Sequence, residues 1–93
     1  MKNLILDVET ILINLFQVGI SSTTDSFIEE ISEISDKCTK YNLILISKVL
    51  NELYLLLKID KTNKTDISAK IMLLTNYINI LKQKITYDKL GGY

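Results

Sequence analysis

The sequence predicts an all-α protein, an antiparallel bundle of about four helices that forms a single domain over residues 1–93. The chain of 93 residues contains no Pro and only three Gly, so few positions interrupt a helix. Apolar residues recur at spacings of three and four, and the short connections between these segments favour antiparallel neighbours. The predicted helices span residues 3–18, 26–40, 43–58 and 66–85, and a loose tail follows at residues 86–93.

Residues 3–18 make the first predicted helix. A strand at residues 4–8 is the competing interpretation, because Ile and Val are frequent there. The polar residues favour the helix, since their 4-3-4-3 spacing places them on one helical stripe, whereas a strand would scatter them over both faces. These residues are Asn3, Asp7, Thr10, Asn14 and Gln17. Gly19 follows where a left-handed C-terminal cap is usual.

The segment "LDVET" within this helix resembles the first motif of proofreading-type exonucleases, in which two carboxylates hold metal ions at the end of a strand. On a helix, Asp7 and Glu9 diverge by about 160° and cannot share an ion. That family also needs further carboxylates and a His or Tyr base, and this chain has no His. We therefore predict that the chain is not a nuclease and not an enzyme.

Residues 26–40 make the second predicted helix, and Ser26 with Glu29 matches a capping box at its start. Its acidic residues lie opposite the apolar face and are expected to be solvated, because a diiron site would also need His. Cys38 has no His or Arg to activate it and is expected to be a buried thiol. The predicted inward face is Phe27, Ile28, Ile31, Ile34 and Cys38.

Residues 43–58 make the third predicted helix, which is unusually apolar. Its predicted core face is Leu43, Ile46, Val49, Leu50, Leu53, Tyr54 and Leu57. Lys48 and Glu52 lie opposite this face, at a spacing that predicts an ion pair. Large aliphatic residues nevertheless flank them, which is uncommon on a surface helix. The first helix repeats this pattern with Ile5, Leu6, Leu12, Ile13 and Phe16.

Side chains of this size lose roughly 1.5 to 3 kcal/mol each if they stay exposed, so together they rival the whole stability of a small domain. We therefore predict that another chain, a second copy or a partner protein, covers them. The alternative is that the first and third helices are the two central ones, with their extra leucines under loops. The predicted interface is Leu6, Ile13, Phe16, Ile44, Leu45, Leu55 and Leu56.

Residues 66–85 make the fourth predicted helix, with Thr65 or Asp66 as its cap. The polar segment before it superficially resembles a calcium loop beginning at Asp60. That loop would need Gly at its sixth position and an oxygen ligand at the fifth, where Lys64 stands. Met72 and Ile80 lie off the apolar face and could extend the interface. The apolar face is Ile67, Ile71, Leu74, Ile78, Leu81 and Ile85.

The composition bears on several classes of function. Eleven lysines balance eleven acidic residues, so the basic excess expected of a nucleic-acid-binding protein is missing. One Cys and no His argue against a zinc site, a disulfide framework and a cofactor held by such groups. Acidic residues interrupt the apolar N-terminal segment, and no stretch reaches the ~18 apolar residues of a membrane helix. We expect a cytoplasmic protein without metal or cofactor, encoded by the AT-rich genome of a bacterium or phage.

Two resemblances add to these expectations. The segment "VGISSTTDSFIEEISEISDKCTKYNLILISKVLNELYLLL" resembles a helical segment of bacterial proteins that carry SWIM-type zinc fingers, often encoded beside AAA+ ATPases, although the zinc ligands are absent here. The length and the ending "GGY" resemble immunity proteins against pediocin-like bacteriocins, which are cytosolic helical bundles. The sequence thus predicts a non-catalytic protein–protein interaction module, either a homo-oligomer or a small subunit of a bacterial or phage assembly. The alternative is a small cytosolic inhibitor of the immunity type that binds one macromolecular target.

Overall fold

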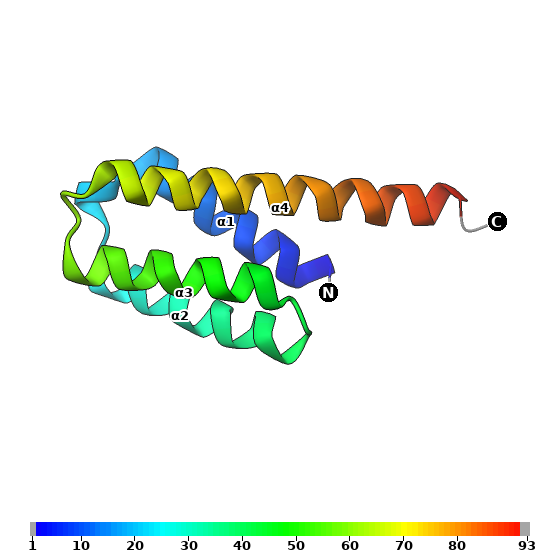
Figure 1. Ribbon diagram of the computed structural model, residues 1–93, viewed down its shortest axis with the longest axis horizontal. Coiled ribbons are helices and arrows are strands. Elements are labelled where there is room, and N and C mark those ends of the chain that lie inside the picture. The colour runs from blue at the N-terminus through cyan, green and yellow to red at the C-terminus, as the bar shows by residue number, and fades with distance from the viewer. Residues whose placement is uncertain (1, 92–93) are drawn as a thin grey trace.

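The computed structural model describes residues 2–91 and confirms the all-α prediction. Its helices are α1 (Lys2–Val18), α2 (Asp25–Lys40), α3 (Ile44–Ile59) and α4 (Lys64–Gly91), with a 3₁₀ turn, η1 (Ile20–Ser22), after α1. The described residues contain no strand, so the helical interpretation of residues 3–18 is correct. Figure 1 shows α3 and α4 running antiparallel, with α1 crossing behind α4.

The four helices form a closed ring around one core. The α2 and α3 helices pack most extensively, α4 packs beside α3, and α1 closes the ring by contacting both α4 and α2. The predicted inward faces of α2 and α3 are confirmed, with Phe27, Leu43 and Tyr54 only partly buried at their edges. On α4 the predicted apolar face supplies Ile67, Leu74 and Ile78 to the core, and Ile71 and Leu81 are partly buried against it. The side chain of Ile85, the sixth predicted residue, lies outside the described ones.

The α1 helix buries a wider arc than the sequence suggests. Ile5 and Leu12 were expected among the outward aliphatic residues, but both are buried in the core. The reason is that α1 contacts two helices on different sides, so a single narrow stripe cannot cover both contacts. The core residues of α1 are Leu4, Ile5, Val8, Ile11, Leu12 and Leu15.

A small polar network lets α2 and α3 approach closely. Ser35 Oγ donates to the carbonyl oxygen of Ser47 at 2.9 Å, and Ser47 Oγ donates to the carbonyl oxygen of Ser35 at 3.0 Å. The Thr39 hydroxyl bonds to the Ser47 hydroxyl. Small side chains at the crossing leave room for the two backbones, and the reciprocal bonds satisfy their buried hydroxyls.

The connections differ in detail from the predicted ones. Gly19 has a positive φ of +88°, but its ψ of 150° lies outside the left-handed helical region, so the predicted left-handed cap is not formed. Its N–H bonds to the carbonyl oxygen of Leu15 at 3.0 Å. The predicted capping box at Ser26 is wrong, because the Thr24 hydroxyl accepts from the N–H of Phe27 at 3.1 Å and α2 starts earlier. Several adjacent Ser and Thr residues can cap a helix here, and the exit direction of η1 selects one of them.

The α4 helix is longer than predicted at both ends. It begins at Lys64, and Asn63 Oδ1 accepts from the N–H of Asp66, so Asn63 takes the capping role expected of Thr65 or Asp66. The helix continues to Gly91, so most of the segment predicted as a loose tail is helical, and residues 92–93 lie outside the described residues. No Pro or Gly interrupts this segment before Gly91. Its C-terminal part extends beyond the other three helices (Figure 1).

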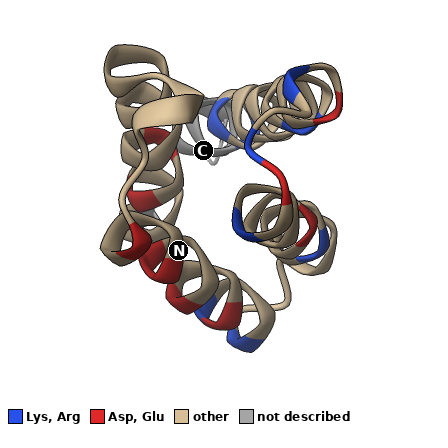
Figure 2. Cartoon of the chain, turned by 90° about the vertical axis from the view of Figure 1, so that its left-hand side faces the viewer, with Lys and Arg blue, Asp and Glu red and all other residues tan. Residues whose placement is uncertain are grey.

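Charge is divided between the two halves of the chain. Seven of the eleven acidic residues lie within residues 1–40, whereas eight of the eleven lysines lie within residues 41–93. Figure 2 shows most of the acidic residues gathered on the side of the bundle formed by α1 and α2. Two ion pairs join the halves, Lys58 with Glu29 at 2.7 Å and Lys82 with Glu9 at 2.9 Å. The charge division therefore helps to hold α3 and α4 against α2 and α1.

Candidate interaction surface

Large apolar side chains lie exposed on α1, α3 and α4. Six of the seven residues predicted as an interface expose between 45% and 81% of their surface: Leu6, Ile13, Phe16, Ile44, Leu45 and Leu55. The seventh, Leu56, differs, because it is partly buried and packs against the core. Met72 and Ile80, the two additional candidates, are also exposed. The alternative that loops cover these side chains therefore does not hold within residues 3–84.

The first group of exposed side chains follows the groove where α3 lies beside α4. We call this surface the α3–α4 face and define it by Leu45, Leu55, Leu73, Tyr77 and Ile80. A hollow of about 440 Å³ at one end is lined by Glu52, Leu55, Leu56, Asp66, Ala69 and Lys70. A hollow of about 340 Å³ at the other end lies among apolar residues, including Leu45, Tyr77 and Ile80. The face is thus an apolar strip with a depression at each end.

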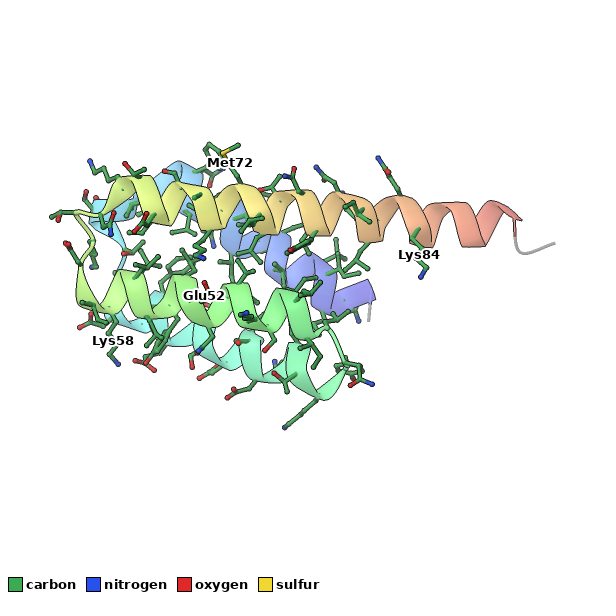
Figure 3. The ribbon with its side chains drawn as sticks, in the orientation of Figure 1. Glu52, Lys58, Met72 and Lys84 are labelled. Atoms are coloured by element: carbon green, nitrogen blue, oxygen red, sulfur yellow. The ribbon has the colours of Figure 1, made fainter. Side chains whose placement is uncertain are left out.

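A single ion pair bridges the two helices of this face. Lys70 pairs with Glu52, and both side chains are partly buried. The hydrogen bond from Lys70 lowers the pKa of Glu52, against the opposing effect of burial, and the charges of Lys70 and Lys48 act in the same direction. The predicted pair with Lys48 is therefore replaced by a cross-helix pair, because α4 places Lys70 closer to the carboxylate than Lys48 is. Figure 3 shows Glu52 between the two helices.

The second group of exposed apolar side chains lies where α1 crosses α4. Phe16 and Met72 line a hollow of about 260 Å³ together with residues of η1. Phe16 also lines a neighbouring hollow of about 180 Å³ with Ile13 and the polar residues Thr75 and Asn79. Polar groups interrupt both surfaces: Glu9, Ser68, Thr75 and Asn79 line the hollows of this α1–α4 surface, and Glu52, Asp66 and Lys70 line one hollow of the α3–α4 face. The apolar side chains of the α1–α4 surface nevertheless stay accessible to another chain.

A polar cluster lies on the other side of α3, where it faces α2. Lys58 donates to Glu29 at 2.7 Å and to the hydroxyl of Tyr54 at 3.0 Å, and Tyr54 donates to Glu29 at 3.2 Å. The hydrogen bond from Lys58 lowers the pKa of Glu29, and the hydrogen bond to Glu29 raises the pKa of Lys58. Both shifts keep the Glu29 carboxylate and the Lys58 ammonium group charged at neutral pH. The cluster fixes α3 against α2.

The candidate groups for chemistry remain apart. Asp7 is exposed, whereas Glu9 bonds to Lys82, so the two carboxylates of "LDVET" point to different surroundings. Cys38 is fully buried, and burial together with the charge of Asp7 raises its pKa to about 11. Among the described residues, no group of three or more His, Cys, Asp or Glu side chains is placed to hold a metal ion. Across this same part of the chain, no helix combines the length and apolar character needed to cross a membrane.

The sequence interpretation missed part of this surface. Leu73 and Tyr77 were not named, although each lies on the α3–α4 face, and Ile59 at the end of α3 is exposed as well. A signal for them exists in α4, where a second series of residues at 4-3 spacing runs beside the apolar series that faces the core. The sequence interpretation considered only the series that faces the core, so it overlooked the outward series.

Comparison with known proteins found no matching protein family, no matching curated protein and no matching solved structure. The resemblances to the segment accompanying SWIM-type zinc fingers and to bacteriocin immunity proteins therefore stay predictions.

Proposed function

We propose that this chain is a non-catalytic protein–protein interaction module, acting in the cytoplasm of a bacterium or in a phage-infected cell. It works as a homo-oligomer or as a small subunit of a larger assembly. The observation that carries this proposal is the exposure of the aliphatic residues on α1 and α3, where side chains such as Leu45 and Ile13 expose more than half of their surface.

Burial of the outward faces, and not of the core, would stabilise the association. The core already contains buried residues from all four helices, so the fold does not need the exposed ones. Contiguous apolar patches larger than a few hundred Å² are uncommon on monomeric proteins and mark interaction sites. Association would bury this surface and recover roughly 25 cal/mol per Å² of it. The mechanism is therefore burial of preformed helix faces, without bond chemistry.

Hydrodynamic mass at micromolar concentration tests the proposal. We expect the wild-type chain to exceed the mass of a monomer, and Leu45→Lys and Leu55→Lys each to lower the average mass. Gln83→Lys is the matched control, because it adds the same charge at an exposed polar position of α4 and should leave the mass unchanged. A monomeric wild-type chain whose two leucine variants keep its mass and stability would contradict the proposal.

A further inference from the structure

The α4 helix carries two parallel series of residues at the spacing of a coiled-coil seam. The inward series, which includes Ile67, Leu74 and Ile78, faces the core. Its outward neighbour follows the same 4-3-4-3-4 spacing. The outward series is Asp66, Lys70, Leu73, Tyr77, Ile80 and Lys84. A helix with two such series can pack against its own bundle and against another helix at the same time.

The outward series has opposite charges at its two ends. Asp66 and Lys84 are both exposed, and Lys84 follows Asp66 by 18 residues, which is five turns and about 27 Å along one side of the helix. Between them lie Lys70, which is paired with Glu52 of α3, and then Leu73, Tyr77 and Ile80. If a second α4 lies antiparallel to the first, with the twofold axis near residue 75, each Asp66 faces a Lys84 of the other copy. This charge order fits antiparallel self-pairing and opposes parallel pairing.

The shape of the α3–α4 face follows the same symmetry. Ile80 projects with 60% of its surface exposed, five residues from the midpoint of the series. On the other side of the midpoint, at an equal distance, lies the hollow of about 440 Å³, which is lined by the apolar residues Leu55, Leu56 and Ala69 and by the charged residues Glu52, Asp66 and Lys70. A twofold axis at residue 75 therefore places Ile80 of each copy over the hollow of the other. The residue of α4 at the matching position is Lys70, whose charge is paired with Glu52, so Ile80 of one copy would lie beside this ion pair of the other.

The area of the face fits a dimer of low affinity. The strip is about 27 Å long and is two helices wide beside α3 but only one helix wide at Lys84, where α4 extends beyond α3 (Figure 3). At about 10 to 12 Å per helix it covers roughly 500 Å². This value lies just below the roughly 600 to 1,000 Å² per partner that stable interfaces bury. Lys48 is a further exposed cation on α3, and it is one helical turn from Glu52, so its charge is partly balanced locally.

We propose that a second copy of this chain docks on the α3–α4 face with its α4 antiparallel to the first. In this arrangement Asp66 of each copy pairs with Lys84 of the other, and Ile80 of each enters the hollow beside Ala69 of the other. This inference rests on the proposed function and specifies its partner and geometry.

Charge reversal of the full chain tests the pairing. Sedimentation equilibrium at low salt is measured for the wild type, for Asp66→Lys, for Lys84→Asp and for the variant with both changes. The proposed dimer contains two Asp66–Lys84 contacts, and each single reversal turns both of them into contacts between like charges. We therefore expect the dissociation constant of the dimer to rise about tenfold or more. The double reversal restores opposite charges at both positions and should return the dissociation constant to within about threefold of the wild type.

A second pair of variants locates the docking face. Ile80→Lys should weaken dimerisation, whereas Met72→Lys, its matched control, should not. Met72 is exposed to a similar extent, 67%, but lies on the side of α4 next to α1. Figure 3 shows Met72 and Lys84 projecting from different sides of α4. Circular dichroism of each variant is the control that it keeps the helical content of the wild type.

The outcomes separate this inference from the proposed function. If the wild type self-associates but the double reversal fails to rescue the single ones, the α4 pairing is wrong and the proposed function stands. If Met72→Lys weakens the dimer and Ile80→Lys does not, the docking face is the α1–α4 surface and the inference is overturned. A wild-type chain that is monomeric at several hundred micromolar contradicts the pairing outright, and unchanged leucine variants would then contradict the proposed function as well.

Discussion

The α2 and α3 helices are neighbours of equal length, 16 residues each, and their outward faces are opposites. Both bury an apolar face in the core, and they pack against each other more extensively than any other pair. The outward face of α2 carries charged groups such as Glu30, Glu33 and Asp36, whereas that of α3 carries Ile44, Leu45 and Leu55. Contact with solvent explains the charged outward face of α2, but it does not explain the aliphatic residues on the outward face of α3. Folding therefore explains the inward residues of both helices, and the proposed association would explain the outward residues of α3.

Truncation of leucines in α3 should give the largest difference between the two faces. Leu53 is fully buried and Leu55, two residues later, is exposed. We expect Leu53→Ala to lower the free energy of unfolding by about 2 to 5 kcal/mol, because it removes core contacts and leaves a cavity. For Leu55→Ala the loss should stay below about 0.5 kcal/mol in the monomer. Urea denaturation at a protein concentration below the dimerisation range measures both.

Equal losses for the two leucines would contradict this division of α3 into a folding face and an association face. The same variants at high protein concentration provide the complementary control. There Leu55→Ala should lose stability relative to the wild type, because association stabilises the folded chain by mass action.

Alkaline pH should have an intermediate effect, through the buried side of α2. Burial raises the pKa of the Cys38 thiol from 9.0 to about 11. The folded chain therefore holds this proton over a range in which the unfolded chain releases it, so stability falls as the pH rises from about 9 to 11. The loss from Cys38 should be on the order of 1 to 2 kcal/mol.

Cys38→Ala isolates this effect from the titration of lysines and tyrosines. The variant should be less stable at pH 7 and should lose less stability between pH 9 and 11 than the wild type does. Identical slopes for the two proteins, measured by urea denaturation across this range, would show that the thiol titrates normally in the folded chain.

The start of α2 should give the smallest effect. Thr24→Ala removes the hydroxyl that accepts from the N–H of Phe27 and should cost about 1 kcal/mol of stability. Ser26→Ala, in the first turn of the same helix, should change stability by only a few tenths of a kcal/mol. Thermal unfolding of the two variants compares them directly. If Ser26→Ala loses more stability than Thr24→Ala, then Ser26, the residue that the sequence pattern favours, caps α2.

The sequence was sufficient to predict the four helices and the inward faces of α2 and α3, because a 3.6-residue period and the absence of Pro constrain both strongly. It was not sufficient to place the helix ends. Thr24 and Asn63 cap α2 and α4, although Ser26 and Asp66 fit the same rules. Capping depends on the direction in which the chain enters the helix, and that direction is set by tertiary packing.

The sequence was also not sufficient to predict the contacts between helices. The partner of Glu52 is Lys70 of α4, 18 residues away, and a rule based on spacing within one helix selects Lys48 instead. Six of the seven predicted interface residues are exposed, as their positions opposite the core required. Leu56 is not, because α4 lies close enough to cover part of it.

The central claim is that the outward aliphatic face of α3 and α4 is covered by a second copy of the chain. Sedimentation equilibrium of the wild-type protein over a series of concentrations tests it most directly. The average mass should rise from 10.6 kDa for the single chain towards twice this value in the micromolar range. A mass that stays at 10.6 kDa up to several hundred micromolar would contradict the claim.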